Sequence, residues 1–260
     1  MSQVIEMKLE DNSQELSSER RTERPSPLAV LRSRNFRLLR IGETISLIGD
    51  QFYMIALSWL VLQLTGDALA VGTLLAIAAV PRALFMLVGG ALVDRFSPRS
   101  LMLTSNLVRL VLVVLLAGLV LSGAIKLWML YVLALFFGLA DAFFYPAQSA
   151  IVPQLVKERD LPWANALIQG MAQLSLFIGP VLAGGLIALF SGGQVSAGGE
   201  SIPELRGIGL AFVIDAATFL ASATTLWLIK VEKKKPAGAE ESAEPVLAGH
   251  QRDPHLRLAG

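Results

Sequence analysis

The sequence predicts an all-α membrane protein with six transmembrane helices. Of its 260 residues, 54% are hydrophobic and only 17% are charged, whereas soluble domains have about 45–50% apolar and about 25% charged residues. The apolar residues gather in long runs, and about 20 of them form a helix that crosses the roughly 30 Å hydrocarbon core of a bilayer. Six runs have roughly this length: 41–64, 70–93, 101–122, 127–150, 166–190 and 208–229.

Lysine and arginine lie almost entirely on one side of these runs. Of the 22 such residues, Lys126 and Arg206 lie in loops on the far side, and Arg82 and Arg109 lie within runs. All the others come before the first run, after the last one, or in the loops that follow the second and fourth runs. Because basic residues stay preferentially on the cytosolic side, we expect both termini in the cytoplasm.

The predicted organisation has three parts. Residues 1–37 are a polar cytosolic tail and a basic lead-in to the membrane, without a signal peptide. Residues 38–230 form the six-helix bundle, and residues 231–260 begin a cytosolic loop that we expect to be disordered. We expect three arginines near the first run to lie against anionic lipid headgroups: Arg34, Arg37 and Arg40.

The residue types that enzymes need are missing from the apolar part of the chain. There is no cysteine, and both histidines, His250 and His255, lie in the polar C-terminal segment. The sequence contains no nucleotide-binding loop and no Ser-His-Asp set. No basic and aromatic pattern suggests a nucleic-acid partner. We therefore expect no enzymatic activity, no cofactor and no metal.

An internal repeat relates the first three runs to the last three. The segment GDQFYMIALS (Gly49–Ser58) aligns without gaps with ADAFFYPAQS (Ala140–Ser149), and LVGGAL in the second run resembles LAGGLI in the fifth. A repeat of three spans inverts the second copy relative to the first, and inverted repeats are common in transporters. The fold expected is therefore an inverted 3+3 repeat.

Ionisable side chains within the runs are the main candidates for function. An acid at the centre of a bilayer costs at least about 2.5–3.5 kcal/mol, so it must face a cavity or a partner. Asp50 and Glu43 are seven residues apart and share a helix face, as do Asp141, Tyr145 and Gln148. The candidates for proton or substrate coupling are Asp50, Glu43, Asp141, Arg109 and Asp215.

These acids have a structural alternative. Burial favours the protonated carboxyl group and an adjacent arginine favours the ionised one, so a carboxylate that changes between the two settings loads and unloads a proton. The alternative is a fixed ion pair that joins helices, with Arg82 or Arg109 as the cation. For Glu43, which is nearer the cytosolic end, the alternative is simple hydration.

The polar stretch GGALVDRFSPRS (Gly89–Ser100) resembles a family signature. It is similar to the G-x-L-x-D-R-x-G-R loop between the second and third helices of the major facilitator superfamily, with Ser97 in place of the usual glycine. The matching residues that the resemblance implies for a gating loop are Gly90, Asp94, Arg95 and Arg99. The alternative is that these charges only anchor a short turn.

The segment IGPVLAGG (Ile178–Gly185) resembles the Gly-Pro motif of the family's fifth helix. The glycine that follows the Gly-Pro pair comes one residue later than in the strict antiporter pattern. The resemblance implies a helix pivot at Gly179, Pro180, Gly184 and Gly185. Tight helix packing is the alternative for this segment.

Four further segments resemble the branch of the family that holds macrolide-efflux and siderophore-export proteins: LTGDALAVG, PRALF, VPQLVKERDLPWANAL and FVIDAATFL. The resemblance covers about residues 31–235. It implies a transporter of the bacterial inner membrane that exports amphipathic small molecules, such as drugs or siderophores, in exchange for protons. The family has twelve helices, so we expect this chain to be its N-terminal half, from a truncated gene or a sequence fragment. The alternative is a six-helix module that transports nothing without a partner half.

The topology is testable because the chain has no native cysteine. A membrane-impermeant maleimide added to sealed cells should label a Gly198→Cys variant, because the loop 191–206 is expected outside. It should not label Ser97→Cys, which is expected in the cytoplasm. Labelling of Ser97→Cys in sealed cells would refute the predicted orientation.

Overall fold

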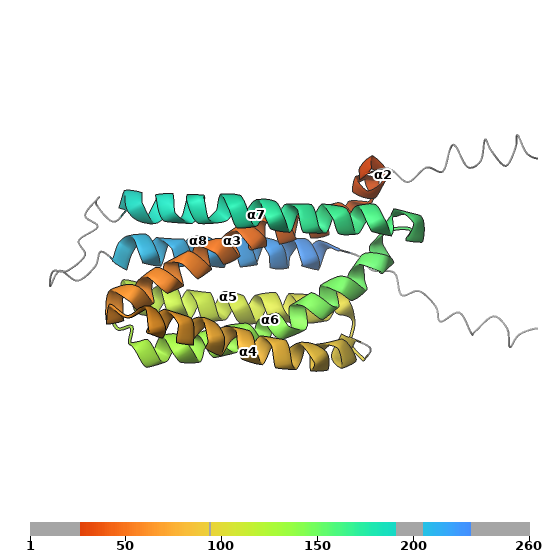
Figure 1. Ribbon diagram of the computed structural model, residues 1–260. Helices are drawn as coiled ribbons and strands as arrows, with labels where there is room; N and C mark the ends of the chain where they lie inside the picture. Colours follow the sequence, from red (N-terminus) through yellow and green to blue (C-terminus); the bar gives the residue numbers. More distant parts are fainter. Residues whose placement is uncertain (1–26, 94, 191–204, 230–260) are drawn as a thin grey trace, which may run out of the picture.

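Six long helices form the body of the protein (Figure 1). The computed structural model describes residues 27–93, 95–190 and 205–229. The long helices are α3 (Arg34–Thr65), α4 (Ala68–Val93), α5 (Pro98–Leu121), α6 (Leu127–Leu155), α7 (Leu161–Phe190) and α8 (Leu205–Leu228). A short helix α2 (Pro27–Arg32) precedes them, and a 3-10 turn (Glu158–Asp160) precedes α7. All six long helices are long and apolar enough to cross a membrane, which confirms the predicted fold class.

Local signals explain where these helices begin and end. Ser33 caps the start of α3, where its hydroxyl accepts a hydrogen bond from the Phe36 N–H. Gly66 ends the same helix in the left-handed conformation, with φ at 65°. Ser97 caps α5 and Pro98 occupies its first turn, where a missing N–H costs nothing. The polar stretch between the second and third runs is therefore a short connection between α4 and α5, which we call the hairpin.

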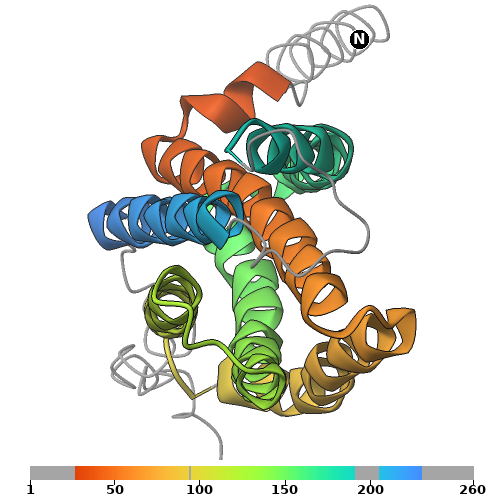
Figure 2. The same ribbon diagram turned by 90° about the vertical axis from the view of Figure 1, so that its left-hand side faces the viewer.

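The first three long helices (α3, α4 and α5) and the last three (α6, α7 and α8) form two triplets that pack mainly against each other. In the first triplet, α4 packs against α6 and α5 packs against both α6 and α8. In the second triplet, α7 and α8 both pack against α3. The first helix of each triplet thus receives the second and third helices of the other one, which is consistent with an inverted repeat. Figure 2 shows the bundle from its end, with α3 crossing between α7 and α8.

Glycines allow the closest helix approaches. Gly138 of α6 faces the backbone carbonyl of Ala78 in α4, and a Cβ atom there would overlap that carbonyl. A Cβ on Gly89 of α4 would lie 2.7 Å from the carbonyl oxygen of Ala142 in α6. Two glycines, one on each helix, therefore set the spacing of α4 and α6, as small residues do in membrane helix pairs.

Two apolar clusters fill the bundle and a polar region separates them. The larger cluster contains the stacked rings of Tyr53 and Phe137, whose centroids are 4.2 Å apart. The smaller one surrounds Phe36 and Met102 near the opposite end of α3. Between the two clusters lie buried polar side chains, which we call the buried polar layer: Ser105, Asn106, Arg109, Asp141 and Ser222.

The outer surface is apolar, most of all along α4 and α7. Leu87 of α4 and Leu189 of α7 are both more than 80% exposed, and many other large apolar side chains on these helices are exposed with them. Such a surface is unsuited to water and suited to lipid or to other apolar helices. The protein is therefore a multi-pass membrane protein.

The structure changes two expectations at the start of the first span. Helix α3 begins at Arg34, seven residues before the predicted apolar run. Arg40 and Glu43 are buried and form an ion pair. Arg40 therefore lies inside the bundle rather than against lipid headgroups, where it is the ion-pair partner of Glu43. Hydropathy alone cannot reveal this pairing. The loop residue Gly198 and the motif residue Asp94 lie outside the described residues.

The close approach of α4 and α6 gives a stability prediction. Gly138→Ala should destabilise the protein by about 1–3 kcal/mol, because the new methyl group must displace a helix backbone. The matched control is Gly118→Ala in α5, where an added Cβ meets no atom within 4 Å. Thermal unfolding of the two variants in detergent measures the difference. An equal unfolding temperature for both variants would contradict the packing described here.

Candidate functional site

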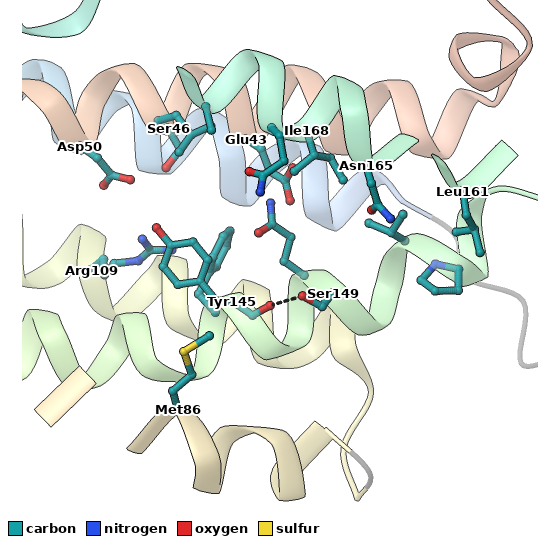
Figure 3. A pocket seen from close by; sticks show the side chains of 17 residues that line it. Glu43, Ser46, Asp50, Met86, Arg109, Tyr145, Ser149, Leu161, Asn165 and Ile168 are labelled. Carbon is teal, nitrogen blue, oxygen red and sulfur yellow. Dashed lines mark hydrogen bonds between the residues drawn. The ribbon is translucent and has the colours of Figure 1, made fainter. Parts of the chain in front are cut away.

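A cavity of about 510 Å³ opens among α3, α4, α5, α6 and α7 (Figure 3). Its apolar walls include Met86, Phe144 and Ile168, and three charged side chains reach it: Glu43, Asp50 and Arg109. Polar uncharged side chains complete the lining, among them Ser46, Tyr145, Gln148, Asn165 and Gln169. The volume is that of a site for a drug-sized molecule, which is typically about 300–1,000 Å³.

Arg109 anchors the buried polar layer beside this cavity. Its Nη1 atom lies 2.7 Å from Asp141 Oδ1, and its Nη2 donates to Asn106 Oδ1 at 2.6 Å. Asn106 in turn donates to the Ser222 hydroxyl at 2.9 Å. The Arg109 guanidinium is only 2% exposed, and these contacts satisfy much of the charge and polarity that burial makes costly. One network therefore joins α5, α6 and α8.

Aromatic rings enclose the same guanidinium. The centroid of the Phe144 ring lies 4.4 Å from Arg109 Cζ, and that of the Phe219 ring lies 4.8 Å away. Cation–π contacts of this kind gain strength where water is excluded. The rings and the Asp141 carboxylate together hold Arg109 in one position.

Asp141 has a second and weaker cationic partner. Arg82 Nη1 of α4 lies 3.4 Å from Asp141 Oδ2, and the Arg82 side chain is 47% exposed. Its guanidinium also lies 5.7 Å from the centroid of the Tyr145 ring. The structure thus brings both predicted cations to a single acid, Asp141.

Asp50 faces the cavity without an ionic partner among the described residues. Its side chain extends from α3 into the space across from Arg109 (Figure 3). Its Oδ1 atom is buried and accepts no hydrogen bond. A buried carboxylate oxygen without a partner is costly, so this position is suited to a proton or to a bound cation.

Asp215 does not line the cavity, although it was predicted with the coupling residues. It is fully buried in α8, where its carboxyl group packs against Gly49 of α3. The Thr218 hydroxyl donates to the Asp215 backbone carbonyl at 2.7 Å, and it lies 3.4 Å from Oδ1. The other oxygen, Oδ2, has no hydrogen-bond partner.

Glu43 lines the cavity nearer the start of α3. Its Oε2 atom pairs with Nη1 of Arg40, one helical turn earlier. The other oxygen, Oε1, is buried without a partner. Arg40 is not part of the cavity lining, so the pair presents its acidic member to the cavity.

The predicted gating loop contacts the last helix of the same bundle. Arg99 donates from Nε to the Leu226 carbonyl at 2.8 Å and from Nη2 to the Trp227 carbonyl at 2.6 Å. These carbonyls belong to the last turn of α8, so Arg99 satisfies groups that a helix end leaves unpaired. Gly90 and Arg95 are exposed. No sequence signal near this loop predicted the contact between Arg99 and the end of α8.

The predicted pivot residues of α7 have different surroundings. Gly179 is buried against α3, where an added Cβ would overlap the side chain of Gln51. Pro180 lies within the helix. Gly184 and Gly185 have open space around the Cβ position, so among the described residues they make no close packing contact there. Among the three glycines of this segment, a close approach to another helix is thus confined to Gly179.

Three residues of the polar network were missed by the sequence interpretation: Asn106, Phe144 and Phe219. Asn106 comes one turn before Arg109 on the same face of α5, a spacing that could have suggested it. The two phenylalanines are ordinary apolar residues in apolar runs, and no sequence signal distinguishes them.

Six helices long and apolar enough to cross a membrane, with a partly polar cavity among them, are typical of membrane transporters. The chain belongs to the Major Facilitator Superfamily, because the model of that family matches residues 40–257. This match confirms the family predicted from the motifs.

Curated relatives from bacteria agree with this assignment. The chain is 26% identical to the MFS-type transporter YvqJ of Bacillus subtilis over 61% of this chain and 37% of the relative. It is 29% identical to YfiS of the same organism over 74% of this chain and 41% of that protein. It is 26% identical to macrolide efflux protein A of Streptococcus pyogenes over 57% and 36% of the two chains. The chain thus spans about two fifths of the length of these relatives. No solved structure matches it significantly.

The ion pair at the centre of the network gives a second stability prediction. Asp141→Ala should destabilise the bundle by about 3–5 kcal/mol, because it leaves the Arg109 charge buried and unpaired. Arg82→Ala should cost less than about 1 kcal/mol, because that side chain is half-exposed and its contact is long. Unfolding in detergent compares the two variants. Equal losses would mean that Arg82, rather than Arg109, is the main partner of Asp141.

Proposed function

We propose that this chain serves the secondary active efflux of amphipathic small molecules, such as drugs or siderophores, in exchange for protons. The observation that carries the proposal is a drug-sized cavity in which apolar walls and an unpaired carboxylate, Asp50, meet. The protein would reside in a bacterial inner membrane with both termini in the cytoplasm, as the distribution of basic residues favours.

The relatives support a transporter, and one of them is named for macrolide efflux. For this chain we propose only the general class of that activity, which is the export of amphipathic molecules. The apolar residues Met86, Phe144 and Ile168 would accept the hydrophobic body of such a molecule. The amide side chains of Asn165 and Gln169 would orient its polar groups.

Proton coupling would act through Asp50. A proton that enters from outside forms an O–H bond at the Asp50 carboxylate and removes its negative charge. When the proton leaves to the cytoplasm, the charge returns and the binding properties of the cavity change with it. Asp141 is less suited to this exchange because Arg109 holds it in a close ion pair at 2.7 Å. We assign Asp141 and Arg109 to the framework and keep Asp215 and Glu43 as secondary proton sites.

The hairpin and α7 would take part in the conformational change. Two carbonyls at the end of α8 accept hydrogen bonds from Arg99. A movement of the hairpin would therefore move or release the end of α8. Gly179 allows α7 to lie close to α3, and Pro180 frees a carbonyl within the helix, which favours a bend. Asp94 would add its charge to the hairpin.

The second candidate is a six-helix module that does not transport without a partner half. The observation that favours it is the length of the chain, which spans 36–41% of the length of each relative. The exposed apolar faces of α4 and α7 would supply a surface for such a partner. Drug accumulation discriminates between the two, because the module alone would leave accumulation unchanged.

The efflux proposal predicts that Asp50→Asn abolishes coupled export without preventing membrane insertion. The amide preserves size and removes the titratable charge. Cells that express the gene with its reading frame intact are loaded with a macrolide, and retained drug is measured with and without a proton gradient. Asp67→Asn is the matched control, because Asp67 is an exposed acid in the turn between α3 and α4. Gradient-driven export that persists in Asp50→Asn would reduce Asp50 to a structural role.

A further inference from the structure

The charges that line the cavity are unevenly satisfied. Glu43, Asp50 and Arg109 reach it, and two of them already have an ionic partner that does not line it. Arg109 is bound to Asp141 at 2.7 Å, and Glu43 is bound to Arg40. Among the described residues, Asp50 alone of the three forms no ion pair. Arg82, the second partner of Asp141, is 47% exposed and does not line the cavity. Among the described side chains that line it, the charge without an ion-pair partner is therefore negative.

The arginine is a poor site for an anionic ligand. Its Nη1 and Nη2 atoms donate to Asp141 and Asn106. Two phenylalanine rings, Phe144 and Phe219, cover its guanidinium at 4.4 and 4.8 Å. An anion in the cavity would have to displace Asp141 while it approached Asp50 and the unpaired Oε1 of Glu43. Like charges at such short range repel strongly where water is scarce.

The cavity that Asp50 faces has both polar and apolar lining residues. Ser46 and Gln148 contribute polar atoms to the same cavity, whereas Met86, Phe144 and Ile168 contribute apolar ones. A ligand with one charged end and one apolar body matches this mixed lining. The volume of about 510 Å³ accommodates a molecule of drug size.

We propose that the cavity selects amphipathic organic cations, with a protonated or quaternary amine, or a similar cationic centre, held against Asp50 and the apolar body held against Met86, Phe144 and Ile168. The proposal rests on the efflux function proposed above and narrows its substrate class. It favours cationic drugs over siderophores that carry negative charge.

Two probe ions of nearly identical size and shape test the sign of the charge. Tetraphenylphosphonium is a cation and tetraphenylborate is its anionic counterpart. Binding of each to the purified chain in the non-ionic detergent dodecyl maltoside is measured by equilibrium dialysis. Ala172→Trp fills the cavity, because Ala172 lines it, and the binding lost in this variant defines the specific component.

The wild-type chain should bind tetraphenylphosphonium specifically and tetraphenylborate not at all. Asp50→Asn should weaken cation binding by about tenfold or more, as the loss of a charge-assisted contact in a site of low polarity predicts. Asp67→Asn should leave cation binding unchanged. The comparison of the two ions on the wild-type chain needs no substitution, so it decides the question even if Asp50→Asn does not fold.

A failure of the proposed selectivity for cations can be distinguished from a failure of the efflux proposal. Specific binding of tetraphenylborate that equals or exceeds that of the cation would overturn the selectivity for cations and leave the efflux proposal standing. Equal cation affinity in the wild-type chain and in a folded Asp50→Asn variant would also overturn it. If neither ion binds specifically, the proposal fails, and efflux lost in Asp50→Asn cells would still support the transport role of Asp50.

Discussion

The buried pair of Arg109 and Asp141 is the constraint around which this bundle is arranged. An unpaired charge in an apolar interior costs several kcal/mol, so the two residues hold α5 and α6 in one register. Asn106 extends the same network to α8 through Ser222. The Arg109 guanidinium is consequently bound within the network that holds these helices together. Asp50, the acid of the cavity lining that forms no ion pair among the described residues, lies across the cavity on α3.

Hydropathy and charge were sufficient for the six spans, because the bilayer imposes length and polarity on each helix separately. The hairpin before α5 was also readable, since Ser97 and Pro98 are local signals for a helix start. Acids within apolar runs pointed to a polar interior for a similar reason, as each is costly on its own. All of these are properties of a segment and need no knowledge of its neighbours.

The sequence could not tell which acid meets which cation. Asp141, Asp50 and Asp215 are all acids within apolar runs, yet the first is paired, the second faces a cavity and the third packs against Gly49. The differences arise from contacts between helices far apart in the chain. Arg40 was misassigned to the lipid surface because its burial depends on the helices that pack around the start of α3, although its ion pair with Glu43 is local to that helix.

The exchange of partners between the triplets has a consequence for biosynthesis. When α5 leaves the ribosome, α3 and α4 have little to pack against, because their main neighbours, α6, α7 and α8, have not yet been made. At that stage the cavity that Asp50 faces would lack its walls from α6 and α7, and Gly89 of α4 would lack its contact with α6. The order of synthesis therefore leaves the first three helices without most of their contacts until α6, α7 and α8 have followed them into the membrane.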